Sequence, residues 1–292
     1  MSVLGVIGGS GVYALDALED ARWEKVESPF GTPSDALLRG RLHGVETVFL
    51  PRHGRGHRIP PSHIDYRANI DALKRCGVTD LVSISACGSL REELSPGTFV
   101  IVDQFIDRTV ARRSSFFEKG LAAHVSMADP VCARLGDLVE ATARAQGIAI
   151  HRGGTYLAME GPQFSSRAES HLYRSWRCDV IGMTNMPEAK LAREAELCYA
   201  SVAMVTDYDC WHPNHDDVTV EAIIKVLLEN ADRARALVRS AAPLIHADNA
   251  AAACACRKAL EHALITAPET RKPAMLKRLD AVAGRMLKGK KK

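Results

Sequence analysis

The sequence predicts an α/β fold, because short apolar runs typical of strands alternate along the chain with segments of helical periodicity. No repeat of about 20 to 50 residues is visible, which argues against solenoids and propellers. Of the 292 residues, 47% are hydrophobic and 25% charged, an ordinary composition for a globular protein. A chain of this length can bury a sizeable core without disulfides or a structural metal.

The strands are predicted from short apolar runs bounded by polar or turn residues. In chain order they are Val3–Ile7, Thr47–Leu50, Asp80–Ser85, Thr98–Val102, Thr155–Met159, Asp179–Met183 and Tyr199–Val205. Helical spacing predicts helices near Arg67–Arg75, Pro130–Ala145, Ser166–Trp176, Pro187–Glu196 and Val220–His246. The apolar stripe within Glu221–Leu228 is expected to lie mostly in the core.

The composition changes after Pro243. Residues 247–292 are alanine-rich and basic, and Pro268 and Pro273 break their helical pattern. We therefore expect a main domain over residues 1–246 and a helical C-terminal extension over 247–292. Its end carries four lysines, interpreted as a solvated tail: Lys288, Lys290, Lys291 and Lys292.

Charge and the N-terminus exclude several classes of protein. The 38 basic and 35 acidic residues give a net charge of +3, and the chain without its lysine tail is close to neutral. A general nucleic-acid binder needs a broad basic face, so nucleic acid is not an expected partner. The N-terminus has no basic region and no apolar run reaches about 18 residues, so we expect neither a signal peptide nor a membrane span, and a cytoplasmic location.

Eight cysteines are scattered along the chain without a C-x-x-C pair. This pattern indicates reduced thiols rather than a disulfide framework or a zinc site, so no metal is expected. Only Cys254-Ala255-Cys256 is closely spaced, and a redox role for it is a minor alternative.

A glycine-rich turn, Gly8-Gly9-Ser10-Gly11, follows the first predicted strand. Its backbone N–H groups and the Ser10 hydroxyl could bind an anion. Gly9-x-Gly11-x-x-Ala14 also matches a loose dinucleotide fingerprint. A dinucleotide site needs an acidic residue ending a second strand about 20 residues later, and the stretch Glu27–Pro33 does not have that character.

Two further turns follow apolar strands and are also suited to an anion. Arg52-His53-Gly54-Arg55-Gly56-His57 brings a guanidinium and imidazoles to a strand end, with solvated loop charges as the alternative. Its two histidines have zinc-helix spacing, but the glycines make a helix there improbable. Ser83–Ser89 offers hydroxyls and exposed amides, and Cys87 within it keeps a cysteine hydrolase open as an alternative.

A pair of carboxylates, Asp207 and Asp209, closes the long apolar run Tyr199–Val205. Residues two apart on an extended chain point the same way. In a partly buried pocket one carboxyl group can hold a proton and donate it while the other stays ionised and accepts. The alternative is one capping and one surface aspartate.

The joint occurrence of these motifs is more specific than any one of them. In unbroken order over residues 3 to 238, the chain resembles the trimeric branch of the purine nucleoside phosphorylase family, and in particular its members that act on 5′-methylthioadenosine. The resemblance is carried by Ile7–Gly11, Arg52–Arg55, Ala86–Glu93, Asp103–Thr109, Glu160–Pro162, Phe164–Ser170 and Thr206–Trp211. It implies a single α/β catalytic domain with a central mixed, partly barrel-like sheet flanked by helices, assembled as a homotrimer.

The resemblance implies phosphorolysis: inorganic phosphate, a co-substrate, displaces adenine from the ribose C1′ and leaves 5-methylthioribose 1-phosphate, without cofactor or metal, in purine and methionine salvage. Carried over by position, the phosphate site is Ser10, Arg52, His53, Ser85, Ala86 and Thr184. Met183 would lie against the ribose, and Phe164 and Ser165 would lie near the base. Asp207, assisted by Asp209, would protonate the departing purine at N7.

The resemblance also implies how substrates are selected. Related enzymes for 6-oxopurines carry Asn at the position of Asp207, so its presence favours a 6-aminopurine. Val220, Ile223 and Ile224 match the apolar wall around the methylthio group, and His124 matches a residue that reaches the 5′ end from a neighbouring subunit. Alternatives are methylthioinosine or an ordinary purine nucleoside as substrate, a hydrolase that uses water, and a nucleoside-binding protein without catalysis.

Overall fold

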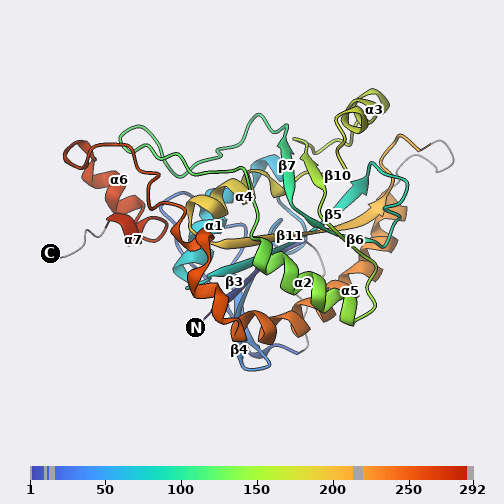
Figure 1. The fold of residues 1–292 in the computed structure, drawn as a ribbon, viewed down its shortest axis with the longest axis horizontal. Helices are drawn as coiled ribbons and strands as arrows, with labels where there is room; N and C mark the ends of the chain where they lie inside the picture. The colour runs from blue at the N-terminus through green and yellow to red at the C-terminus, as the bar shows by residue number, and fades with distance from the viewer. Residues whose placement is uncertain (1, 10–11, 13–16, 213–219, 288–292) are drawn as a thin grey trace.

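The computed structural model describes residues 2–9, 12, 17–212 and 220–287. Its centre is one mixed sheet (Figure 1). The strands are β1 Leu4–Gly8, β2 Glu19–Glu24, β3 Leu37–Leu42, β4 Val45–Pro51, β5 Asp80–Ser89, β6 Phe99–Val102, β7 Gln104–Asp107, β8 Ile150–Arg152, β9 Thr155–Ala158, β10 Val180–Gly182 and β11 Cys198–Asp207.

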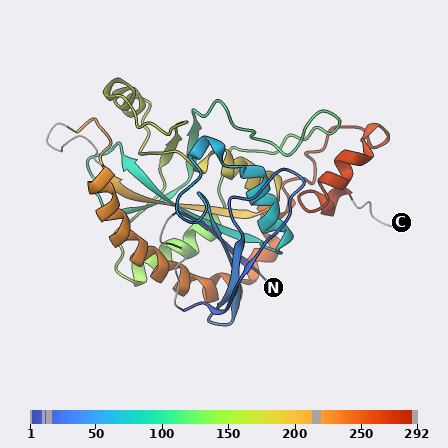
Figure 2. The same ribbon diagram turned by 180° about the vertical axis from the view of Figure 1, so that it is seen from behind.

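The sheet follows the order β2-β3-β4-β1-β5-β10-β9-β7, and it branches at β5. The long β5 pairs in parallel with β1 and β11, and its last residues pair antiparallel with β10. β11 then pairs with β6, and β6 with β8. This branch curls the sheet over itself and gives the expected partly barrel-like form. The N-terminal strands at the other edge are seen best from behind (Figure 2).

Helices cover both faces of the sheet. The helices are α1 Tyr66–Arg75, α2 Ala133–Ala145, α3 Arg167–Ser175, α4 Asn185–Glu194, α5 Val220–Ala247, α6 Pro273–Arg278 and α7 Gly284–Leu287. α2 packs with α5, and α1 packs with α4 (Figure 1). Alternate strand residues therefore enter different apolar clusters: Ile7 and Leu81 face α1 and α4, whereas Val6 and Val82 face α2 and α5.

All the predicted strands and the helices before residue 247 are present, with ends shifted by a few residues. The sequence pattern missed β2, β3, β7 and β8. β2 is an exposed edge strand with the sequence Glu-Asp-Ala-Arg-Trp-Glu, so it lacks the apolar alternation that predicts a half-buried strand. β7 and β8 have four and three residues, too few to show a period.

The expectation that the stripe in Glu221–Leu228 lies mostly in the core is wrong for Ile224 and Leu228, which are 48% and 61% exposed. Among the described side chains of α5, Leu227 is partly buried against the apolar cluster, and full burial begins at Asn230 and Ala231. Helical periodicity around Ile224 and Leu228 therefore does not report burial in this chain.

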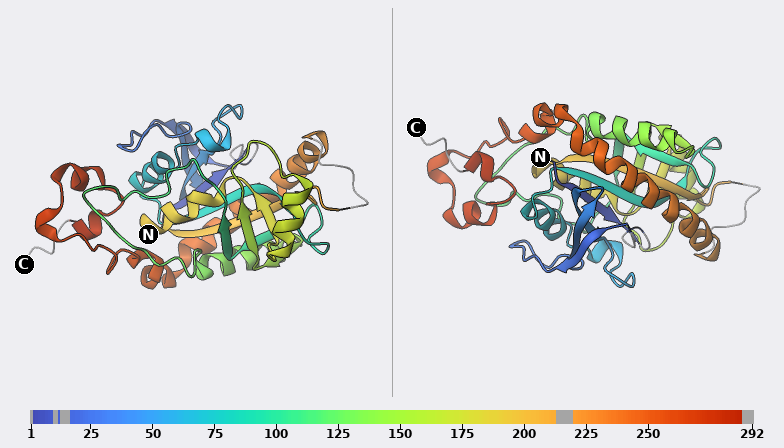
Figure 3. Two further views of the ribbon diagram at one scale, coloured as in Figure 1. Left: turned by 90° about the horizontal axis from the view of Figure 1, so that it is seen from above. Right: turned by 90° about the horizontal axis from the view of Figure 1, so that it is seen from below.

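The C-terminal segment after α5 consists of short helical pieces, as the two prolines in its sequence led us to expect. Residues 249–253 and 255–258 form 3-10 turns, followed by α6 and α7. Leu260, Leu279 and Val282 are buried in the same apolar cluster as α1 and α4. The segment lies at the end of the molecule away from α3 (Figure 3). The lysine tail lies outside the described residues.

None of the described helices is long and apolar enough to cross a membrane.

Candidate active site

The predicted site residues converge because parallel strands end together. β1 is paired in parallel with β4 and β5, and β11 with β5, so the turns that follow these strands lie at one edge of the sheet. A cavity of about 520 Å³ lies there. Of the predicted site residues, it is lined by Arg52, His53, Ser85, Ala86, Phe164, Met183, Thr184, Asp207 and Asp209.

Arg52 is almost completely buried at the floor of this cavity. Its Nε and Nη2 donate to Glu188 Oε2 and Oε1 at 2.9 and 3.2 Å, and Nη2 also donates to Ser83 Oγ at 2.7 Å. Nη1 donates to the Ile84 carbonyl at 2.9 Å. Nη1 has a second N–H for which the described residues offer no acceptor, and this group can donate to an anion in the cavity. The Glu188 charge offsets the cost of burying the guanidinium.

His53 lines the cavity beside Arg52 as a neutral imidazole. Burial, together with the Arg52 charge, lowers the pKa of His53 to about 4. Its Nδ1 lies 2.8 Å from the Ile59 carbonyl, which only accepts, so Nδ1 carries the proton. Nε2 is therefore an acceptor, suited to the O–H of a protonated phosphate. The ring stacks on His57 with centroids 4.2 Å apart.

Ser85, Ala86 and Thr184 supply small polar groups on the same wall. The Ser85 hydroxyl donates to Asn185 Oδ1 at 3.1 Å, and because hydroxyls rotate it can donate to an anion instead. Thr184 precedes α4, and its side chain makes no capping hydrogen bond to that helix. Ser10 lies outside the described residues.

Asp207 and Asp209 line the cavity at the end of β11. Asp207 accepts hydrogen bonds from Thr206 Oγ1 at 2.6 Å and from the Asp209 N–H at 2.8 Å. Asp209 has a left-handed backbone with φ of 53°, and its buried Oδ2 has no hydrogen-bond partner among the described residues. Burial raises the pKa of both carboxyl groups, and the Asp207 charge raises that of Asp209 further. Such a pair holds a proton to a higher pH than an exposed aspartate does.

Met183 and Phe164 also line the cavity. Met183 packs so close to Gly161 that a Cβ there would come within 2.5 Å of its sulfur. Phe164 is half exposed, and Ser165 beside it donates a weak hydrogen bond to Met159 Sδ at 3.6 Å. Ser165 is next to cavity residues without lining the cavity itself.

Ile224 and His124 do not line the cavity. Ile224 is exposed, and among the described side chains of α5 the one that lines the cavity is Leu227. The side chains of Val220 and Ile223 lie outside the described part of the chain. His124 is exposed on a loop whose backbone pairs with Ala263 of the C-terminal segment.

Comparison with known proteins agrees with this geometry. The family model of the phosphorylase superfamily matches residues 3–243. S-methyl-5′-thioadenosine phosphorylases of Cereibacter sphaeroides and Rhodospirillum rubrum are 64% and 63% identical, over 99% and 98% of this chain and 99% and 97% of their own length. The chain belongs to the S-methyl-5′-thioadenosine phosphorylase family.

Solved members of this family have the same fold. A methylthioadenosine phosphorylase from an Antarctic soil metagenomic library is 48% identical with a TM-score of 0.91, covering 96% of this chain and 98% of its own. A Schistosoma mansoni methylthioadenosine phosphorylase in complex with adenine is 36% identical, with a TM-score of 0.85. The match covers 89% of this chain and 97% of the Schistosoma chain.

The structure argues against three alternative functions of these motifs: a cysteine hydrolase, a dinucleotide site and a zinc-binding helix. Cys87 is buried, and desolvation raises the pKa of its thiol, so it is not poised as the thiolate of a cysteine hydrolase. β1 is followed in the described chain by the edge strand β2 rather than by a dinucleotide-binding helix. Gly54 and Gly56, between His53 and His57, have positive φ, which rules out a zinc-binding helix there.

Two residues of the site could not be identified from the sequence. Glu188 holds Arg52, and Arg112 donates to the carbonyls of Met183, Met186 and Glu160 with its side chain 1% exposed. Arg112 thereby fixes the turn that carries Met183 and Thr184. Glu188 follows Arg52 by 136 residues within a helical pattern, and Arg112 lies in a loop, so neither has a periodic or motif signal.

Proposed function

We propose that the protein catalyses phosphorolysis of S-methyl-5′-thioadenosine to adenine and 5-methylthioribose 1-phosphate. One observation carries the proposal: a single cavity holds both an anion-binding wall, Arg52 with His53 and Ser85, and a buried carboxyl pair, Asp207 and Asp209. Phosphorolysis needs these two groups on either side of a glycosidic bond. The family membership of the chain agrees with it.

Phosphate is the attacking group in this proposal. Arg52 and the hydroxyls of Ser85 and Thr184 would donate to its oxygens, and Nε2 of neutral His53 would accept a hydrogen bond from its remaining O–H group. Held in this way, a phosphate oxygen forms the new bond to C1′ as the C1′–N9 bond breaks, so the binding energy orients the nucleophile. We include Ser10 in this site on the basis of its position in the sequence.

The departing purine receives the electron pair of the broken bond. Asp207, with its raised pKa, would transfer a proton to N7, so that adenine leaves neutral while Asp207 becomes ionised. Asp209 would accept from the 6-amino group with its unpartnered Oδ2. Each step is made by side chains and phosphate, so we propose no cofactor for the reaction.

The remaining parts of the substrate would be held by apolar surface. We propose that Met183 lies against the ribose and that Phe164 and Ser165 lie against the base. Leu227, together with Val220 and Ile223, would surround the methylthio group, whereas the exposed Ile224 is left out of this wall. Met204 and Leu227 contribute apolar side chains to the cavity lining, and an apolar wall suits a thioether better than a hydroxyl.

We further propose a cytoplasmic homotrimer that acts in purine and methionine salvage, with residues 1–246 as the catalytic domain, residues 247–292 as an extension, and His124 reaching a neighbour's 5′ site. Phe164 before α3, Leu172 on it and Trp176 directly after it expose apolar surface, which supports self-association. All eight cysteines are free, typical of a reducing compartment. Light scattering should give a mass of three 31.8 kDa chains; a monomer mass would contradict the trimer.

The test of the reaction is release of free base from methylthioadenosine, methylthioinosine and adenosine, each with and without inorganic phosphate. We expect phosphate-dependent release that is fastest from methylthioadenosine. Release without phosphate would make the protein a hydrolase, and a preference for the inosine analogue would contradict the roles of Asp207 and Asp209.

A further inference from the structure

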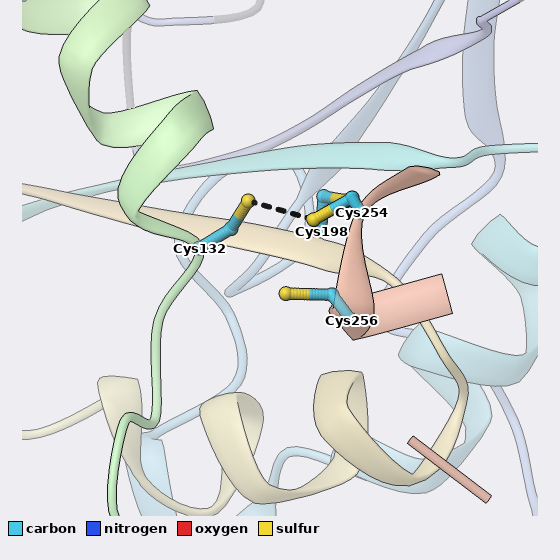
Figure 4. A group of neighbouring side chains, drawn as sticks. All are labelled: Cys132, Cys198, Cys254 and Cys256. Carbon is cyan, nitrogen blue, oxygen red and sulfur yellow. Dashed lines mark hydrogen bonds between the residues drawn. The ribbon is translucent and has the colours of Figure 1, made fainter. Parts of the chain in front are cut away.

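Four cysteines from three distant segments of the sequence meet at one point (Figure 4). Cys132 is the N-cap residue of α2, Cys198 begins β11, and Cys254 and Cys256 flank the first residue of the 3-10 turn at 255–258. Their Sγ atoms all lie within 4.8 Å of one another, and those of Cys132 and Cys254 are 3.6 Å apart. Cys132, Cys198 and Cys256 are buried.

This cluster plays no part in the proposed reaction. Cys198 is the first residue of β11 and Asp207 the last. At about 3.3 Å per residue the strand separates the two by about 30 Å. The cluster therefore needs an explanation of its own.

The arrangement of the sulfurs fits one ion better than disulfides. Four thiolates around Zn²⁺ at about 2.3 Å in a tetrahedron stand about 3.8 Å from one another, close to the separations seen. A disulfide needs about 2.05 Å between two sulfurs and would select one partner for each. Here each sulfur is near all three others, so the four form a single centre.

The surroundings of the cluster are suited to negative charge on sulfur. Arg193 Nη1 donates to Cys256 Sγ at 3.4 Å, and Cys132 lies where the N–H groups of the first turn of α2 are directed. Arg134 and Arg257 flank the cluster, and they are in part neutralised by ion pairs with Asp80 and Asp248. Such outer partners orient and stabilise thiolate ligands.

We propose that Cys132, Cys198, Cys254 and Cys256 bind one zinc ion that fastens the C-terminal segment to the start of β11 and of α2. The site has four protein ligands and hence no open position, which is typical of structural rather than catalytic zinc. No metal is expected from the sequence, because it has no C-x-x-C pair. The four ligands come from three distant segments, and only the fold brings them together.

The first experiment measures zinc in the untagged full-length protein, purified without chelator, by mass spectrometry of the metals. About one zinc per chain is expected for the wild type, and at least a tenfold lower content for the double variant Cys254→Ser/Cys256→Ser. Cys76→Ser is the matched control, because Cys76 is another buried cysteine outside the cluster and should leave the zinc content unchanged.

A second experiment uses the wild-type protein alone, so that it does not depend on the folding of a variant. Replacement of zinc by Co²⁺ should give the visible absorption of a tetrahedral thiolate site, and chelation should lower the Tm by about 5 °C or more, reversibly. Alkylation of the denatured protein without reductant should modify all eight cysteines. Less than about 0.1 zinc per chain, or disulfides among the four cysteines, would overturn the proposal. Iron in place of zinc would overturn the choice of metal.

Discussion

Asp207 and Asp209 lie two residues apart at the end of β11, where Asp207 is partly buried and Asp209 is buried. Burial raises the pKa of each carboxyl group, so a proton can stay on the pair at a pH where an exposed aspartate has lost it. Thr206 Oγ1 and the Asp209 N–H fix the Asp207 carboxyl group. The chemistry assigned to the pair follows from this enclosure.

Asp207→Asn should lower kcat/KM for methylthioadenosine by about 10² or more, since general acid catalysis is lost. The amide can donate to a 6-oxo group, so the relative rate with methylthioinosine should rise. Steady-state kinetics on both nucleosides measures the two effects. Unchanged rate and preference would remove Asp207 from the mechanism.

The second prediction at this scale concerns the protonation of His53. Its pKa of about 4 in the folded protein lies below the ordinary 6.5, so protonation favours the unfolded chain. Its contribution, about 3 kcal/mol at most, is fully present above pH 6.5 and is lost as the pH falls from 6.5 to 4. NMR titration of the ring should give a midpoint near 4, with His53→Gln to assign the signal; a midpoint near 6.5 would contradict a neutral His53.

Site residues that follow apolar strands could be found from the sequence, because parallel strands bring such turns to one edge. Arg52, Ser85 and Asp207 are of this kind. Glu188 could not be identified from the sequence, because its role depends on which helix packs against Arg52. A single glutamate in a helical pattern predicts only a solvent-exposed position.

Between elements, the pair of Glu188 on α4 and Arg52 after β4 ties a helix to the phosphate wall. Glu188→Gln leaves the buried guanidinium without its counter-charge and should lower the free energy of unfolding by about 3 kcal/mol. The KM for phosphate should rise more than that for the nucleoside.

Denaturant unfolding and kinetics measure these two effects of Glu188→Gln. Tyr199→Phe is the control, since it removes one hydrogen bond of 3.0 Å to Glu188 but keeps the charge, and it should cost only about 1 kcal/mol. Equal effects of both variants on the KM for phosphate would show that the charge is not what positions Arg52.

α5 presents neighbouring leucines to different surroundings. Leu227 lines the cavity, whereas Leu228 is exposed. Leu227→Asn should lower kcat/KM for methylthioadenosine more than for adenosine, because a polar wall penalises the thioether. Leu228→Asn is the matched control, and its kcat/KM for each of the two substrates should equal that of the wild type. Equal losses for both substrates in Leu227→Asn would place the methylthio wall elsewhere.

Elements with a clear apolar period, such as β5, β11 and α2, were predictable from the sequence. β2 and β8 were not, because an exposed edge strand and a three-residue strand carry no period. The exposure of Ile224 and Leu228 has the same origin: a period shows that a helix has an apolar side, but not where along the helix the core ends.

On the scale of the whole molecule, one end of the sheet carries the cavity and the other end of β11 carries the cysteine cluster. The branching of the sheet at β5 places the turns after β1, β4, β5 and β11 around the cavity. Neither the branch nor the meeting of four distant cysteines follows from local sequence, because both depend on long-range pairing.

The most direct test of the account follows both products of one reaction. Methylthioadenosine and inorganic phosphate are incubated with the enzyme, and ³¹P NMR records the phosphorus while chromatography records adenine. The account predicts a new sugar 1-phosphate signal that grows in a one-to-one ratio with adenine and is absent without phosphate. Adenine released while all phosphorus stays inorganic would contradict it.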